Sequence, residues 1–120
     1  MSKRILVVDD DTMFSDMLSE ILTEEGFTTL VEHDGATGLA RALAEHPDLL
    51  IMDFMMPHLS GLEALKQLRA DAWGKGIPVF LLTNMAQADF GSDAVGPTEC
   101  LLKTDWTLDA LAKKVAETLK

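Results

Sequence analysis

The sequence predicts an α/β fold: a single five-stranded parallel sheet with helices on both faces, in the doubly wound (βα)5 arrangement. Five short apolar runs recur along the 120 residues, and segments with apolar residues at helical spacing lie between them. Polar side chains directly follow most of these runs. Short buried strands that alternate with amphipathic helices are typical of a parallel sheet, because the crossover helices cover both of its faces.

The N-terminal quarter of the chain supplies the first strand, the first helix and the second strand. Residues 5–8 form an unbroken run rich in β-branched side chains, which suits a strand buried on both faces. The helix that follows ends at Gly26, and residues 27–32 indicate a second strand. The residues expected on the inward face of this helix are Met13, Phe14, Met17, Leu18, Ile21 and Leu22.

The second helix and the third strand come next. Asp34 can cap a helix that runs to about His46, where Pro47 ends it. Residues 49–52 then form a third buried strand. The residues expected to face inward from this helix are Leu39, Ala42 and Leu43.

The third helix begins at a capping box made by Ser60 and Glu63, and it runs through Arg69. Residues 78–82 predict a fourth strand. The weakest helical signal covers residues 84–96, where glycines favour a short or mobile helix.

The last strand and helix complete the alternation. Residues 99–102 predict a short fifth strand. Because the chain ends with the following helix, we expect residues 1–120 to form one domain with no separate output domain. The apolar positions that mark this last helix are Leu108, Leu111, Ala112, Val115 and Leu119.

Composition limits the classes of function. Hydrophobic residues make up 48% and charged residues 25%, as in a globular domain, and the formal net charge is -10. This acidity argues against nucleic acid and anionic membranes as partners. The single cysteine, Cys100, allows no internal disulfide, and no apolar run is long enough for a signal peptide or a membrane span. We therefore expect a cytoplasmic protein.

Polar residues gather at one predicted edge of the sheet. Ligands of open α/β sheets bind beyond the carboxyl ends of the strands, and four of the five predicted strands end there in polar side chains. Chance placement would scatter such residues over both edges. In chain order, the residues at this edge are Asp9, Asp10, Asp11, Asp53, Thr83 and Lys103.

These residue types are suited to phosphoryl transfer to a carboxylate. Neighbouring carboxylates repel one another, and Mg²⁺, which prefers oxygen ligands, relieves that repulsion. The cation also neutralises charge on the transferring group. An aspartate can be the nucleophile, a lysine ammonium can hold phosphoryl oxygens, and a threonine hydroxyl can donate to another of them.

At these positions the sequence resembles the response-regulator receiver family, which has a chemotaxis-type, flavodoxin-like fold. The resemblance covers essentially the whole chain, and its segments follow in family order. They are ILVVDDD at residues 5–11, LIMDFMMP at residues 50–57 followed by Ser60 and Gly61, LLT at residues 81–83, and LLK at residues 101–103.

The resemblance implies a role for each matching residue at the acidic edge. Asp53 would be the phosphoacceptor and a ligand of Mg²⁺. Asp10 would bind the metal directly, Asp9 would act mainly through a metal-bound water, and the backbone carbonyl of Met55 would be a further ligand. The protein would be a switch that catalyses only its own phosphorylation and dephosphorylation, not an enzyme with turnover.

The resemblance also implies how the signal enters and leaves. A sensor histidine kinase or a histidine phosphotransfer protein would donate the phosphoryl group and dock on the first helix and the loops around the acidic edge. Lys103 would hold the phosphoryl group, and Thr83 would move toward it. The output would be binding to a downstream protein by a monomer or weak dimer.

Three positions depart from the family pattern. Thr104 replaces a proline joined by a cis bond, and because a cis bond before another residue costs about 2.5–4 kcal/mol, we expect a trans bond and an altered loop. Cys100 stands where the family has its switch aromatic, which weakens the expected coupling to Thr83. Asn84 replaces a small residue and is expected to slow reactions with small molecules.

Two other functions remain open from the sequence. A receiver-like interaction module that no longer uses phosphorylation is compatible with Cys100 and Thr104. A haloacid-dehalogenase-type phosphatase is the second, because Asp9 and Asp11 mimic its Asp-x-Asp motif. That family usually needs a larger fold and a cap.

Several residues also have simpler structural interpretations. Asp11 is expected to be a helix N-cap, Cys100 a small buried hydrophobe, and the histidines surface groups. Met55 and Met85 are the candidates for exposure, and because neither can orient water we expect a long-lived phosphoryl state. The methionines that either fill the core or form a soft docking patch are Met13, Met17, Met55, Met56 and Met85.

Overall fold

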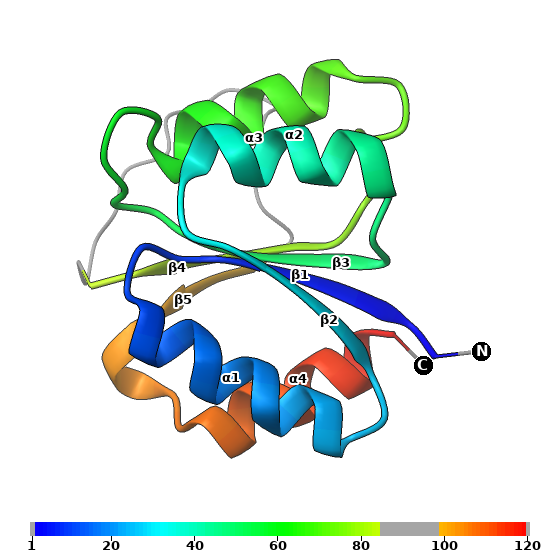
Figure 1. Ribbon diagram of the computed structural model, residues 1–120, viewed down its shortest axis with the longest axis vertical. Helices are drawn as coiled ribbons and strands as arrows, with labels where there is room; N and C mark the ends of the chain where they lie inside the picture. Colours follow the sequence, from blue (N-terminus) through cyan, green and yellow to red (C-terminus); the bar gives the residue numbers. More distant parts are fainter. Residues whose placement is uncertain (1, 85–98, 120) are drawn as a thin grey trace.

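The computed structural model describes residues 2–84 and 99–119, and all five predicted strands are present in it. They form one parallel sheet in the order β2-β1-β3-β4-β5 (Figure 1). The order reverses direction between β1 and β3, which creates the crevice where ligands of such sheets bind. The strands are β1 (Arg4–Val8), β2 (Thr28–Glu32), β3 (Leu49–Asp53), β4 (Val79–Thr83) and β5 (Glu99–Leu102).

Helices cover both faces of the sheet, as predicted. On one face lie α1 (Thr12–Glu24) and α4 (Leu108–Thr118), and on the other lie α2 (Gly35–Glu45) and α3 (Gly61–Ala70) (Figure 1). Most of the helix predicted at residues 84–96 falls outside the described residues. Among the described helices, none is long and apolar enough to cross a membrane.

Each face of the sheet has its own apolar core. The alternating side chains of the strands divide between these cores, because successive residues of a strand point to opposite faces. On β1, Ile5 and Val7 pack with α1 and α4, whereas Leu6 and Val8 pack with α2 and α3. Burial on both faces explains why the strands appear in the sequence as continuous apolar runs.

The predicted inward face of α1 is partly wrong. Its fully buried residues are Ser15, Leu18 and Leu22, whereas Met13 and Met17 are 73% and 48% exposed. The two methionines lie on the opposite side of the helix from Ser15, since residues two apart on a helix point about 200° apart. Because Ser15 is polar, the pattern of apolar residues does not reveal that its side of the helix faces inward. The Ser15 hydroxyl donates a hydrogen bond to the Thr12 carbonyl at 3.1 Å.

Caps begin the helices where the sequence suggests. The Asp11 side chain accepts from the Phe14 backbone N–H, which confirms Asp11 as the N-cap of α1. Ser60 accepts from the Glu63 N–H at 3.2 Å at the start of α3. Thr107 caps α4 in the same way, a cap that the sequence analysis did not identify.

The end of the sheet at β5 differs from expectation in one respect. Cys100 is exposed rather than buried, because β5 is an edge strand and only Leu101 of its apolar residues is buried in the core. After β5 the chain enters a 3₁₀ turn, Lys103–Asp105. No cis peptide bond occurs in the described residues, so the trans bond predicted before Thr104 is confirmed.

Candidate functional site

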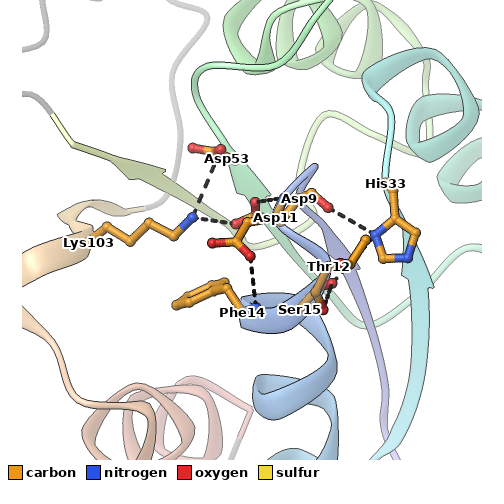
Figure 2. Close-up of polar contacts among 8 residues, drawn as sticks. All are labelled: Asp9, Asp11, Thr12, Phe14, Ser15, His33, Asp53 and Lys103. Carbon is orange, nitrogen blue, oxygen red and sulfur yellow. Dashed lines mark hydrogen bonds and ion pairs between the residues drawn. The ribbon is translucent and has the colours of Figure 1, made fainter.

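The carboxyl edge of the sheet brings Asp9 and Lys103 into direct contact. Asp9 follows β1 and is buried, while Lys103 follows β5 at the other end of the chain. The Lys103 ammonium donates to Asp9 Oδ2 at 2.7 Å, and the Asp11 backbone N–H donates to Asp9 Oδ1 at 2.9 Å (Figure 2). Both oxygens of the Asp9 carboxylate therefore have fixed partners.

Asp53 lies beside this pair at the end of β3. Its residue exposure is only 5%, and its Oδ2 is 4.0 Å from the Lys103 Nζ. The other oxygen, Oδ1, is buried and has no hydrogen-bond partner among the residues that the structure describes. A buried carboxylate oxygen without a partner is costly, so this atom is suited to receive a ligand.

The backbone around Asp53 is held on both sides. The Phe54 N–H donates to the Leu82 carbonyl of β4 at 2.7 Å, and the Gly61 N–H donates to the Phe54 carbonyl at 2.9 Å. A Cβ added at Gly61 would lie 2.3 Å from the backbone oxygen of Asp53. A glycine is therefore required where the first turn of α3 meets the end of β3.

The environment raises the pKa of Asp53 to about 6. Burial contributes most to the increase, and the negative charge of Asp9 adds to it, with a smaller contribution from Asp10. The Lys103 charge and the nearby backbone N–H of Met55 lower the pKa and so oppose it. The carboxyl group is thus close to its protonation equilibrium near neutral pH, where a typical aspartate is fully ionised.

Three carboxylates are placed to share a cation. Asp9, Asp10 and Asp53 each offer one oxygen, and these atoms lie within 4.8 Å of one another. Asp10 is exposed, whereas the other two are buried, so the group opens to solvent on one side. Asp53 Oδ1, which has no hydrogen-bond partner within residues 2–84 and 99–119, and the repulsion that raises the pKa of Asp53 both fit a hard divalent cation such as Mg²⁺.

The remaining predicted residues lie at the same edge at different depths. Thr83 is the buried last residue of β4, and the register pairs Asp53 with the preceding residue, Leu82. Met55 lies in the loop after β3 and is 56% exposed, as predicted, while Met56 is buried. Met85 falls outside the described residues.

The structure adds two residues that the sequence analysis did not place at the site. The ring of Phe14, in the first turn of α1, lies 4.2 Å from the Lys103 Nζ. The Nδ1 of His33 is 3.1 Å from the Asp9 carbonyl, so it carries the hydrogen and donates to it (Figure 2). His33 is exposed, as predicted, but this hydrogen bond also links it to the turn after β1.

Helical spacing alone could not reveal either contact. Phe14 was expected only on the inward face of its helix, and nothing in the local sequence links it to Lys103. His33 follows β2 and has no ligand spacing with another residue. Both contacts join segments that only the sheet order brings together, since β2 lies next to β1 and β5 follows β4.

Comparison with known proteins agrees with the geometry. The family model for the response regulator receiver domain matches residues 5–116. The chain belongs to the response-regulator receiver family. As a receiver domain of two-component signalling, it belongs to a family of phosphorylation-controlled switches.

Two relatives in mycobacteria are similar to this receiver domain. The DNA-binding response regulator MtrA of Mycolicibacterium paratuberculosis is 42% identical over 83 residues, covering 69% of this chain and 36% of that protein. The response regulator MprA of Mycobacterium ulcerans is 40% identical over 100 residues, covering 78% of this chain and 42% of that protein. This chain thus spans only about half the length of these relatives.

Solved structures confirm the fold. The chemotaxis response regulator CheY4 of Vibrio cholerae superposes with a TM-score of 0.89 at 30% identity, covering 99% of this chain and 100% of that one. A CheY-like receiver domain from Methanospirillum hungatei gives 0.88 at 28% identity, covering 99% of this chain and 94% of that one. The predicted five-stranded, doubly wound flavodoxin-like fold is therefore confirmed.

Proposed function

We propose that Asp53 of this receiver domain accepts a phosphoryl group, with Mg²⁺ as the cofactor. The observation that supports this most strongly is the convergence of Asp9, Asp10, Asp53 and Lys103 from three different strand ends. In this proposal Asp53 would be the nucleophilic carboxylate, with Asp9 and Asp10 as cation-binding carboxylates and the Lys103 ammonium near it. An aspartate in that setting is equipped to form an acyl phosphate.

The reaction would run as a displacement at phosphorus. An oxygen of the Asp53 carboxylate forms a bond to phosphorus, and the bond from phosphorus to the imidazole nitrogen of the donor phosphohistidine breaks. The electron pair of that bond leaves with the imidazole, which is released as histidine once it carries its proton. The attacking group must be ionised, and at neutral pH a carboxyl with a pKa of about 6 is mostly in that form.

Four residues would hold the cation. Asp10 and Asp53 would be direct ligands, and Asp9 would act mainly through a water molecule. The backbone carbonyl of Met55 would be a further ligand. When bound, Mg²⁺ neutralises charge on the transferring phosphoryl group. The exposed position of Asp10 and the buried positions of the other carboxylates support entry of the ion from solvent.

Lys103 and Thr83 would act on the phosphorylated state. Lys103 already has its ammonium within 4.0 Å of Asp53 Oδ2, so it can hold the phosphoryl oxygens with little movement. Thr83 ends the neighbouring strand and would donate its hydroxyl to another phosphoryl oxygen. Because Met55 is exposed and apolar, it offers nothing to orient an attacking water, which supports a long-lived acyl phosphate.

The biological setting belongs to the same proposal. The donor would be a sensor histidine kinase or a histidine phosphotransfer protein in the cytoplasm, and residues 1–120 would act as one receiver domain. The output would be a change in binding to a downstream protein. Catalysis would be limited to phosphorylation and dephosphorylation of Asp53, so the protein would not turn over free substrates.

The geometry disfavours a haloacid-dehalogenase-type phosphatase. Such an enzyme would use Asp9 as nucleophile and Asp11 as its acid–base partner. Here both Asp9 oxygens are engaged, and the Asp11 carboxylate caps α1 through the Phe14 N–H. Neither side chain is disposed for those roles.

Intact mass spectrometry after incubation with Mg²⁺ and acetyl phosphate tests the proposal. We expect wild-type protein to gain one phosphoryl group and Asp53→Asn to gain none. Omission of Mg²⁺ should abolish the gain. An unmodified wild-type mass under conditions where the protein is folded and binds Mg²⁺ would refute phosphoacceptor function and favour a receiver-like interaction module.

A further inference from the structure

We propose that Phe14 is a positioning residue for phosphoryl transfer, whose ring face holds the Lys103 ammonium beside Asp53 when a divalent cation draws on the Asp9 carboxylate. This inference rests on the proposed function of Asp53 as phosphoacceptor. It concerns an aromatic side chain that provides no ligand to the metal and no group to the phosphoryl transfer.

Three groups surround the Lys103 ammonium. Its Nζ lies 2.7 Å from Asp9 Oδ2, 4.0 Å from Asp53 Oδ2 and 4.2 Å from the centroid of the Phe14 ring. Only 13% of the Lys103 side-chain surface is exposed. Figure 2 shows the ring and the lysine approaching from different segments, α1 and the turn after β5.

The position of the ring is fixed by the same turn that carries the acidic residues. The Phe14 N–H donates to Asp11 Oδ1 at 3.2 Å, and the Asp11 N–H donates to Asp9 Oδ1 at 2.9 Å. The Phe14 side chain also packs against the core formed by α1 and α4. The cap therefore holds the backbone of Phe14, and packing against the core limits the movement of its ring away from Lys103.

Lys103 benefits from an uncharged partner because the Asp9 carboxylate can bind either the Lys103 ammonium or a cation. In this structure Asp9 Oδ2 binds Lys103, and the same carboxylate belongs to the group of three that can hold a cation. A cation bound there weakens the attraction between Asp9 and the ammonium. The ring keeps its attraction for the ammonium, because a π face binds a desolvated cation without using a carboxylate.

The contact between Phe14 and Lys103 is expected to affect the rate of phosphoryl transfer. If Lys103 lost both Asp9 and the ring, its long side chain would sample many rotamers and leave Asp53. With the ring in place, the ammonium stays next to the oxygen that becomes phosphorylated. We therefore expect the ring to increase the rate of phosphoryl transfer by about 3- to 10-fold, within the range of a partly desolvated cation–π contact.

Nuclear magnetic resonance of the metal-free protein provides a test that is independent of activity. In wild type, the ring current of Phe14 should shift the ε-methylene protons of Lys103 upfield. Phe14→Leu should return them to the usual lysine position, while Phe14→Tyr, which keeps the π face, should retain the shift. Unshifted Lys103 protons in the wild-type protein would overturn the proposal.

The kinetic test uses the same variants with Mg²⁺ and acetyl phosphate. Phe14→Leu should lower the second-order rate constant of phosphorylation about 3- to 10-fold, and Phe14→Tyr should restore it to within about 2-fold of wild type. Mg²⁺ affinity should be unchanged in both. A parallel loss of Mg²⁺ affinity in Phe14→Leu would assign the effect to the acidic group and overturn the positioning role.

Two controls separate positioning from packing. Ile21→Val trims another partly buried residue of α1 in the same core, and its rate should equal that of wild type. In a Lys103→Gln background, Phe14→Leu should cause no further loss, because the ammonium it acts on is gone. An equal loss with and without Lys103 would show that Phe14 acts only through the fold.

Failure of this inference can be distinguished from failure of the proposed function. If wild type gains no phosphoryl group, Asp53 is not the phosphoacceptor and the kinetic role of Phe14 falls with it. If wild type is phosphorylated on Asp53 and Phe14→Leu reacts at the wild-type rate, only the role of Phe14 is refuted. Thermal unfolding of each variant verifies that the compared proteins are folded.

Discussion

At the scale of single residues, the chemistry depends on an aspartate whose surroundings oppose its charge. Asp53 is buried and faces the negative charges of Asp9 and Asp10. In the part of the chain that the structure describes, the Lys103 charge and a backbone N–H offset them. When no cation or phosphoryl group is bound, the folded protein disfavours the ionised form of the Asp53 carboxyl group. Binding of a cation or a phosphoryl group would relieve that tension.

Replacement of Asp53 should stabilise the protein in a pH-dependent way. The folded pKa of about 6 lies above the ordinary value of 3.8, so the folded state binds the proton more tightly than the unfolded state. Stability from this group is therefore present at low pH and is lost as pH rises through about 6. We expect metal-free Asp53→Asn to be about 1–3 kcal/mol more stable than wild type at pH 7, with little difference at pH 4.

Urea denaturation at both pH values measures this difference. Asp16→Asn is a matched control, because Asp16 is an exposed residue of α1 and undergoes the same change of charge. It should change stability by no more than about 0.5 kcal/mol. Equal stability of Asp53→Asn and wild type at pH 7 would show that the carboxylate is not strained.

A second residue-scale prediction concerns the cation. Mg²⁺ at about 10-fold above its dissociation constant should stabilise the folded protein by about 1.4 kcal/mol, because only the folded state assembles the three carboxylates. Asp10→Asn should lose most of this gain, while Asp16→Asn should keep it. Thermal unfolding with and without Mg²⁺ provides the measurement, and a gain in Asp10→Asn equal to that of wild type would remove Asp10 from the ligand set.

At the scale of elements, the site depends on how closely α3 approaches β3. Gly61, the first residue of α3, donates to the Phe54 carbonyl and leaves no room for a Cβ against the backbone of Asp53. The loop between them is thereby fixed at both ends. Any change that moves α3 away from β3 should also move Asp53, the proposed phosphoacceptor.

Gly61→Ala is expected to destabilise the protein by about 1–3 kcal/mol and to slow phosphorylation of Asp53, because the added methyl group forces α3 away from β3. Gly76→Ala is the control, since a Cβ at Gly76 would meet nothing within 4 Å. Chemical denaturation and the rate of reaction with acetyl phosphate report the two effects. Wild-type behaviour of Gly61→Ala would mean that α3 adjusts without cost.

The outer face of α1 gives a prediction about partner docking. Met13 and Met17 are exposed, and their helix begins next to the acidic group. Changing both to glutamine should leave stability within about 0.5 kcal/mol of wild type, whereas Leu18→Ala in the buried stripe should cost about 2–5 kcal/mol. If α1 is the docking helix, the double variant should also slow transfer from a phosphohistidine protein.

The reaction with acetyl phosphate separates docking from chemistry. The small donor needs no contact with α1, so the Met13→Gln/Met17→Gln double variant should react with it at the wild-type rate. A loss of rate with both donors would indicate damage to the site. An unchanged rate with the phosphohistidine protein would place the docking surface elsewhere.

At the scale of the whole molecule, the order of the strands creates the site. Because β1 lies between β2 and β3, the acidic turn after β1 adjoins both His33 and Asp53. Because α1 and α4 share one face (Figure 1), the first turn of α1 lies near the turn after β5. Phe14 of the first turn therefore contacts Lys103 of the second. A parallel sheet aligns all its carboxyl ends, so these contacts follow from the topology as much as from the residues.

Much of this arrangement could be predicted from the sequence. The strands were recognisable because burial on both faces makes them continuous apolar runs, and all five appeared within a residue or so of their predicted bounds. The acidic edge was recognisable because Asp9, Asp53 and Lys103 directly follow such runs. The positions of the described helices could be predicted from their capping residues and from the spacing of their apolar residues.

Other features depended on tertiary structure because they are contacts between distant segments. Spacing could not show which side of α1 packs inward, since Ser15 is buried and Met13 is exposed, nor that Cys100 lies exposed on an edge strand. The raised pKa of Asp53 and the ring of Phe14 over Lys103 likewise arise only after folding. The sequence thus determined which groups reach the carboxyl edge, through local patterns of burial, whereas packing determined their distances, their charge states and their neighbours.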